Sequence, residues 1–147
     1  MKYFFLLGVC TGLLAITGVG QQANAQSASW TTLTSNAKVE IQQTPGACTY
    51  DESPMDNGQM AVLRVRNKTN APVQVSFRVD VYYGDDCATC ANPEYVFTAT
   101  IPANGSIQGG CNADSPQKSM LTVLTAYTNR TLTPAFNRIE INQLTAN

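Results

Sequence analysis

The chain of 147 residues contains no histidine. Histidine is the usual general base near neutral pH and the commonest side-chain metal ligand. Its absence excludes Ser-His and Cys-His nucleophile pairs and the common catalytic zinc sets. Adjacent carboxylates on a loop, such as Asp85 and Asp86, usually point apart, so a glycosidase pair is not expected either. The sequence therefore predicts a protein that is not an enzyme.

Charge is also scarce. Charged residues make up 13% of the chain, and its 9 basic residues, set against 10 acidic ones, form no run. A mildly acidic chain without a basic patch lacks the electrostatic footprint of proteins that bind nucleic acid or anionic membranes. We therefore expect no nucleic acid and no membrane surface as partners, and nothing in the composition indicates a cofactor.

Long apolar runs are missing beyond the first twenty residues. Residues 4–19 form an apolar segment behind Lys2, and the small residues of Ala23-Asn24-Ala25 follow. This pattern predicts a signal peptide, so we divide the chain into a cleaved segment, a polar tail and one β-sandwich domain, at residues 1–25, 26–36 and 37–147. No later run is long enough to span a bilayer. We expect a secreted or periplasmic protein whose mature chain does not insert into a membrane.

Helical periodicity is lacking as well, and alternation takes its place. From Val73 to Tyr83 every odd position is apolar, while the even positions are mostly polar. Side chains alternate faces along a strand, so this stretch predicts a long central strand with one buried face. Six shorter strands are predicted at residues 38–43, 60–67, 94–101, 106–110, 120–127 and 136–144. The predicted fold is all-β, a seven-stranded antiparallel sandwich.

The hairpin at residues 62–77 consists of an apolar strand, a polar turn that ends in Pro72, and the start of the central strand. It resembles the central hairpin of immunoglobulin-like domains in exported bacterial proteins. The resemblance implies an immunoglobulin-like sandwich. It implies no single activity, because such domains serve adhesion, assembly, carbohydrate binding and scaffolding alike.

Four cysteines follow the predicted signal peptide, namely Cys48, Cys87, Cys90 and Cys111. An even number in an exported chain predicts two disulfides that hold the sandwich together. Spacing alone does not fix their pairing. The Asn104-Gly105 turn brings the last cysteine back toward the start of the 94–101 strand, which favours Cys90–Cys111 and leaves Cys48–Cys87.

Successive antiparallel strands reverse direction, so alternate loops fall at the same end of a sandwich. The short turns near residues 69, 104 and 130 should share one end. The long loops should share the other, and they comprise residues 44–58, 84–93 and 110–118. This long-loop pole carries the four cysteines and most of the acidic residues. We predict that it binds an unknown protein or glycan partner. The contact residues predicted at this pole are Tyr50, Asp51, Glu52, Asp85, Asp86 and Asp114.

Other interpretations of the same pole stay open. Cys87 and Cys90 have the CxxC spacing of thiol–disulfide exchange, although the acidic residues before them disfavour a thiolate and no helix follows. Together with Cys48 and Cys111 they could instead hold zinc. Carboxylate oxygens are calcium ligands, and the loop candidates are Asp51, Asp56, Asp85, Asp86 and Asp114.

A third class of function is an assembly factor that lends a sheet edge to another chain. The sequence does not name the edge strand. In residues 120–127 both faces are apolar, with Met120 and Leu124 on the face that an ordinary sandwich leaves in water. This pattern indicates cover by the tail around Trp30, a position at a crowded end of the sheet, or a surface for protein contact.

Overall fold

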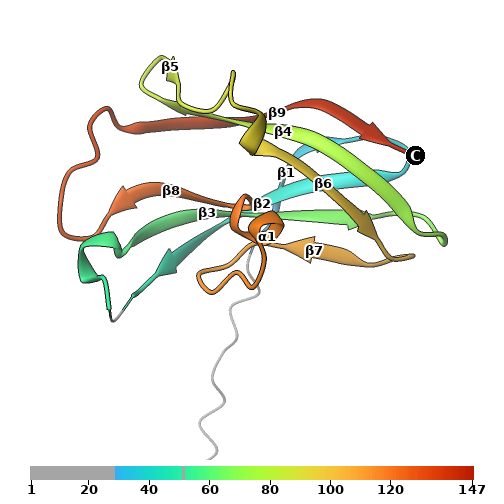
Figure 1. Cartoon of the computed structure of the whole chain (residues 1–147), viewed down its shortest axis with the longest axis horizontal. Coiled ribbons are helices and arrows are strands. Elements are labelled where there is room, and N and C mark those ends of the chain that lie inside the picture. The colour runs from blue at the N-terminus through green and yellow to red at the C-terminus, as the bar shows by residue number, and fades with distance from the viewer. Residues whose placement is uncertain (1–28, 51) are drawn as a thin grey trace, which may run out of the picture.

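The computed structural model describes residues 29–50 and 52–147. The predicted signal peptide, the first residues of the tail and Asp51 lie outside these ranges. Two antiparallel sheets lie one above the other with the core between them (Figure 1), which confirms the prediction of an all-β fold with disulfides. None of the helices in the described part of the chain is long and apolar enough to cross a membrane. They are η1 (Pro54–Asp56), η2 (Pro93–Tyr95) and α1 (Pro116–Ser119).

Sheet A contains five strands. Their bounds are β1 (Thr31–Ser35), β2 (Val39–Cys48), β3 (Gly58–Asn67), β7 (Ser106–Gln108) and β8 (Thr122–Tyr127). They follow the order β1–β2–β3, with β7 and β8 both on the far side of β3. Strand β1 falls in the stretch predicted to be a polar tail. Its backbone pairs with β2 from Thr31 opposite Gln43 to Ser35 opposite Glu40.

Sheet B contains four strands. Their bounds are β4 (Val73–Tyr83), β5 (Asp86–Cys87), β6 (Val96–Ile101) and β9 (Phe136–Ala146). Strand β4 is central: β9 lies along one side of it, and β6 and β5 share the other. Its bounds are those predicted for the central strand.

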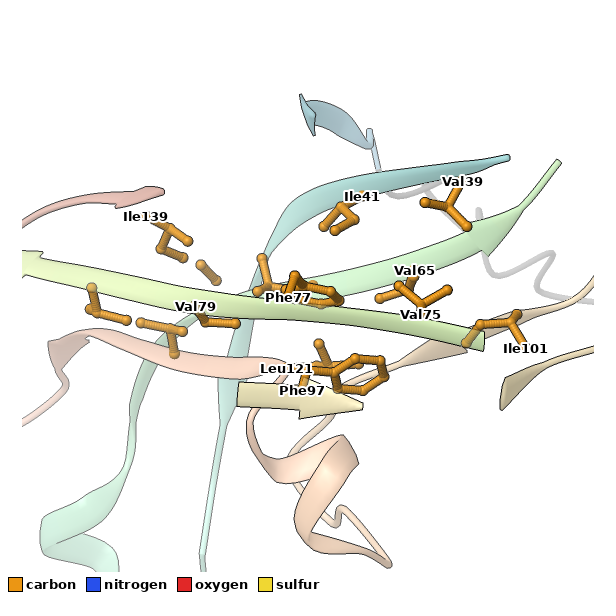
Figure 2. Close-up of a cluster of buried hydrophobic side chains, with 14 of the residues drawn as sticks. Val39, Ile41, Val65, Val75, Phe77, Val79, Phe97, Ile101, Leu121 and Ile139 are labelled. Carbon is orange, nitrogen blue, oxygen red and sulfur yellow. The ribbon is translucent and has the colours of Figure 1, made fainter. Parts of the chain in front are cut away.

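The core forms where the apolar faces of the two sheets meet. The alternating side chains of β4 point into it, and Figure 2 shows Phe77 at the centre of the buried cluster. Phe77 stacks on Phe97 of β6 with ring centroids 4.8 Å apart. At one end of the sandwich, buried Asn67 donates its side-chain amide to the carbonyls of Ala71 and Pro102, at 2.7 and 2.9 Å. That amide ties two turns together, as predicted for the short-turn end.

One edge of sheet A departs from the predicted connectivity. Strand β7 pairs with residues 64–66 of β3, and β8 pairs with residues 58–62, so both strands run in the same direction along one edge. The loop between them therefore leaves from the middle of the edge and not from the long-loop pole. The turn near residue 130 was predicted at the short-turn end of the sandwich. That prediction is wrong, because the turn lies at the other end. Arg130 lies 3.9 Å from Asp56 of η1. Figure 1 shows the β2–β3 and β8–β9 connections at this same end.

Candidate functional site

The two disulfides are Cys48–Cys111 and Cys87–Cys90, so the favoured pairing of Cys90 with Cys111 is wrong. The reason is the shared edge of β3. Because β8 continues in the direction of β7, the loop between them turns outward and folds over the outer face of sheet A. Cys48 ends β2 opposite Gly58 and shares that outer face with Met60. The cysteine of the folded-over loop therefore meets Cys48 and leaves it only 2% exposed.

The Cys48–Cys111 loop borders a hollow of about 280 Å³, which we call the outer hollow. Tyr50 closes one side of it, and the backbone N–H of Tyr50 donates to the Asn57 side chain. Met60 and Leu124 supply apolar floor, while Asn112 adds a polar rim. This arrangement explains why Met60 and Leu124 are apolar on an outer face: the disulfide-bonded loop covers them. Trp30 of the tail packs elsewhere, with the Arg64 guanidinium 4.0 Å from its ring.

A second hollow, of about 230 Å³, opens between the sheets, and we call it the inter-sheet cleft. Val79 and Val81 of β4 face Met120 and Val123 across it. The hydroxyl of Tyr83 donates to the carbonyl of Leu124 at 2.9 Å and joins the two sheets at this point. Burial raises the pKa of Tyr83, so the hydroxyl keeps its proton and remains a donor across the physiological range.

The Cys87–Cys90 loop borders the same cleft through the residues inside the CxxC. Thr89 is buried, and its hydroxyl accepts from the Val81 N–H and donates to the Val79 carbonyl, both at 2.8 Å. Ala88 adds a backbone bond to the Val81 carbonyl at 2.9 Å. These bonds fill the gap along β4 between the end of β6 pairing and the start of β5 pairing. The CxxC loop thus completes the sheet, which is its evident structural role.

Asp80 lies beneath this loop on the outer face of sheet B. It is 1% exposed and is the one buried charged residue of residues 29–50 and 52–147. Arg78 binds both its oxygens, at 2.6 and 2.9 Å, and Asn142 of β9 donates at 2.7 Å. The Arg78 hydrogen bond lowers the pKa of Asp80, with help from Asn142 and against the opposing effect of burial. The carboxylate is therefore ionised at neutral pH.

Asp80, Cys87 and Cys90 form the one group of three or more metal-ligand residues, among those the structure describes, whose ligand atoms lie within 4.8 Å of one another. The group differs from both predicted metal sites. The four-cysteine zinc set is split into two disulfides, and sulfurs in a disulfide supply no thiolate ligands. The loop acids predicted for calcium are not members of this group.

A second polar network adjoins Asp80 on the same face. Arg138 of β9 donates to Glu140 at 2.7 Å, and its guanidinium lies 3.7 Å from the ring centre of Tyr82. The Arg138 hydrogen bond lowers the pKa of Glu140. The Tyr82 hydroxyl also lies 3.6 Å from the sulfur of Cys90. Polar side chains of β4 and β9 therefore lie next to the Cys87–Cys90 disulfide.

The predicted contact residues do not gather into one acidic cluster. Tyr50 is half-buried at the outer hollow, and Glu52 is exposed on the same loop. Asp85 is exposed on the β4–β5 turn of the other sheet, and Asp86 is exposed at the start of β5. Asp114 lies on the loop over sheet A and pairs with Lys118 at 2.9 Å, which lowers the pKa of Asp114. Asp51 is outside the described residues. What joins these loops is the pair of hollows, which share Ser119, Thr122 and Leu124.

Sequence reasoning missed Arg78, Asp80 and Thr89. Arg78 and Asp80 stand two apart on one strand and so share a face, which is a usable signal for an ion pair. No local signal tells that the CxxC loop folds over that face and buries the carboxylate. Thr89 carries no signal either, because its partners are backbone groups of β4.

Strand β9 forms one edge of sheet B. Among residues 29–50 and 52–147, β9 pairs with β4 and with no other strand, so its second side is an edge of eleven residues. It carries Arg138 and Glu140 and has an irregular register near Gln143, whose φ is 56°. Charged residues and bulges protect edges against pairing with another chain. The geometry of the β9 edge therefore does not favour this strand as the one lent to another chain.

Comparisons with known proteins add no family. No family model, no curated protein and no solved structure matches the chain. The features of the described residues that bear on function are the two hollows and the CxxC loop.

Proposed function

We propose that this protein is an exported, non-enzymatic β-sandwich of immunoglobulin-like type that binds another polypeptide. The binding surface consists of the inter-sheet cleft and the outer hollow, which lie on either side of the segment from Ser119 to Leu124. The predicted signal peptide and the two disulfides support export, because disulfides persist in oxidising compartments.

One observation carries this proposal: each disulfide-bonded loop borders one of two adjoining hollows. Ala88 and Thr89 of the CxxC loop border the inter-sheet cleft, and Cys111 borders the outer hollow. Loops held on a rigid scaffold are the usual place for binding residues. Covalent closure of these loops reduces the conformational entropy that binding would otherwise have to fix.

The lining of the cleft favours a protein partner over a glycan. Its walls are mainly aliphatic, and Met120 is a flexible, polarisable side chain that adapts to varied apolar shapes. Tyr95 stands at the cleft and is 36% exposed. An apolar side chain of an extended segment fits such a cleft, with backbone polar groups of the segment over the polar rim of the outer hollow.

The test is selection of ligands from a peptide library and from a glycan array, with the immobilised mature chain as bait. Each ligand is then titrated against Met120→Lys, which places a charge in the cleft, and against Met55→Lys. Met55 is 60% exposed on η1 and lines neither hollow. We expect peptide ligands that lose about tenfold or more in affinity with the first variant and bind the second normally.

Peptide ligands that bind Met120→Lys as tightly as the parent chain would overturn the proposed surface. Glycan ligands without peptide ligands would replace the protein partner by a carbohydrate. Thermal unfolding of each variant separates a lost surface from a lost fold.

A further inference from the structure

The Cys87–Cys90 disulfide has features that completion of β4 does not require. Cys90 borders a hollow of about 250 Å³ on the outer face of sheet B, and Arg78 and Gln143 line the same hollow. Cys87 and Cys90 are both half-buried, whereas in the other disulfide Cys111 is half-buried and Cys48 is buried. An incoming group therefore has room to approach Cys90 beside a guanidinium.

The loop is also held without the help of its disulfide. The Thr89 hydroxyl and the Ala88 amide bind the backbone of β4, and the Asn92 amide donates to the Thr89 carbonyl at 3.1 Å. None of these bonds involves a sulfur atom, so opening of the sulfur–sulfur bond removes none of them directly. The two thiols would stay next to each other, ready to close again.

Some groups near the two sulfurs favour formation of a thiolate, and others oppose it. The backbone N–H of Cys90 points at the Cys87 sulfur at 3.1 Å, a contact that stabilises a thiolate there. The buried carboxylate of Asp80 lies within 4.8 Å of both sulfurs and opposes thiolate formation. Arg78 offsets that carboxylate from 2.6 Å. Asp85 and Asp86, which argued against a thiolate in the sequence, are exposed to water, which screens them.

We infer that Cys87–Cys90 is a thiol–disulfide exchange site whose reactivity the Arg78–Asp80 pair sets, and that its substrate is a pair of thiols on another exported polypeptide. The substrate thiolate attacks the sulfur of Cys90 and forms a mixed disulfide. The Cys87–Cys90 bond breaks, and its electron pair leaves on Cys87 as the thiolate that the Cys90 N–H stabilises.

The second substrate thiolate then attacks its own chain's sulfur in the mixed disulfide and releases Cys90. The substrate loses two electrons and two protons and gains a disulfide. This protein gains two thiols. The transfer is stoichiometric and needs no other oxidant.

The experiment uses the oxidised mature protein and a synthetic peptide with two cysteine thiols. Acid quenching, alkylation and intact mass follow both partners over time at pH 7. We expect one peptide disulfide per protein, with Cys87 and Cys90 alkylated and Cys48–Cys111 intact. A peptide of residues 85–93, oxidised at its two cysteines, is the matched disulfide without Arg78 and Asp80.

Two variants separate exchange from a structural role. Removal of the carboxylate by Asp80→Asn should speed the transfer about fivefold, and removal of the cation by Arg78→Gln should slow it about fivefold. Arg78→Lys, which keeps the charge, should react at nearly the parent rate. Arg66→Gln removes the ion pair with Glu40 on sheet A, away from this disulfide, and should leave the rate unchanged.

Three results would each overturn the inference. One is the absence of peptide oxidation. Another is a shift of the rate in the same direction by Asp80→Asn and Arg78→Gln, since loosened structure alone would expose the disulfide in both. The third is an equal rate, with equal salt dependence, for the protein and the 85–93 peptide.

Discussion

The two disulfides differ in loop length, in the burial of one cysteine and in the charges beside them. Cys48–Cys111 joins residues 63 apart in sequence, is buried at Cys48, and fixes a loop to the outer face of sheet A. Cys87–Cys90 joins residues 3 apart, is half-buried, and lies against a carboxylate. Hydrogen bonds hold the first loop at its two ends, from Gly109 to Leu63 and from Gly110 to Thr122, whereas Thr89 anchors the second loop to β4 from within the CxxC.

This contrast separates a bond that stabilises from a bond that is free to react. The chain-entropy model assigns more stabilisation to closure of a long loop than of a short one, about 4 against about 2 kcal/mol for these separations. A bond whose loop is already fixed by hydrogen bonds adds less still. We therefore expect the fold to tolerate opening of the shorter disulfide better than opening of the longer one.

The largest expected effect comes from loss of the longer disulfide. Replacement of both Cys48 and Cys111 by alanine should lower the free energy of unfolding by about 4 kcal/mol. Urea unfolding at neutral pH, followed by Trp30 fluorescence, measures this change. A loss no greater than that of the Cys87→Ala/Cys90→Ala chain would break the comparison.

Loss of the shorter disulfide should cost less. The Cys87→Ala/Cys90→Ala chain should lose about 2 kcal/mol or less, because Thr89 and Ala88 still bind β4. Hydrogen exchange at the amide of Val81 reports directly on that anchoring. Full exchange at this amide, with the rest of β4 protected, would show that the disulfide and not Thr89 holds the loop.

Thr89→Val tests the anchor itself. Valine has a similar shape but leaves the Val81 N–H and the Val79 carbonyl without their hydroxyl partner, a cost of about 1–2 kcal/mol. The matched control is Thr98→Val on β6, whose hydroxyl lies 3.2 Å from that of Ser76 at an exposed position. Equal stability of the two variants in urea would refute a special role for Thr89.

Acid sharpens the comparison through Asp80. Its folded pKa lies below the unfolded value near 3.8, so the associated stability is present above that value and is lost as the pH falls through the folded pKa. The parent chain should therefore lose stability below about pH 4, and Asp80→Asn should flatten this loss while lowering stability at pH 7. Unfolding midpoints from pH 7 to pH 2 measure both changes. An unchanged acid slope in the variant would assign the loss to other carboxyls.

The smallest effect is expected on the loop that Cys48–Cys111 fixes. Lys118→Ala removes the exposed ion pair to Asp114, and we expect no resolvable change in unfolding free energy. The pKa of Asp114 should rise toward its ordinary value because it loses the Lys118 hydrogen bond. A carboxyl titration by NMR measures that rise, and a measurable loss of stability would show that the pair helps to hold the loop.

Elements with strong alternation could be predicted from the sequence. Eleven alternating residues defined β4 at both ends, because one buried face leaves a period of two in the chain. Strand β1 was predicted to be tail since Thr31–Ser35 has one apolar side chain, Leu33, and is held by backbone pairing that any side chain permits. Alternation reports burial, and β1 is mostly exposed.

The site was harder to predict because it depends on how the chain returns to a sheet. The pairing of Cys111 with Cys48 follows from the collinear placement of β7 and β8, which no local pattern in either strand encodes. Asp80 stands at an even, polar position of the alternating stretch, and the structure places it on the outer face of sheet B. Its burial comes from a loop several residues later in the chain, so the sequence indicated the face and not the cover.

The collinear strands β7 and β8 also bear on how this molecule could change over time. Leu63 of β3 accepts from the Gly109 N–H at 3.0 Å and donates to the Leu121 carbonyl at 2.7 Å, so the ladder passes straight across the interruption. A Cβ at Gly109 would collide with the Leu121 carbonyl, which fixes glycine at the exit point. The loop between Gly109 and Leu121 therefore begins and ends opposite the same residue of β3, Leu63. Additional residues can be inserted in this loop without change to the sandwich, and such an insertion could bind a different partner.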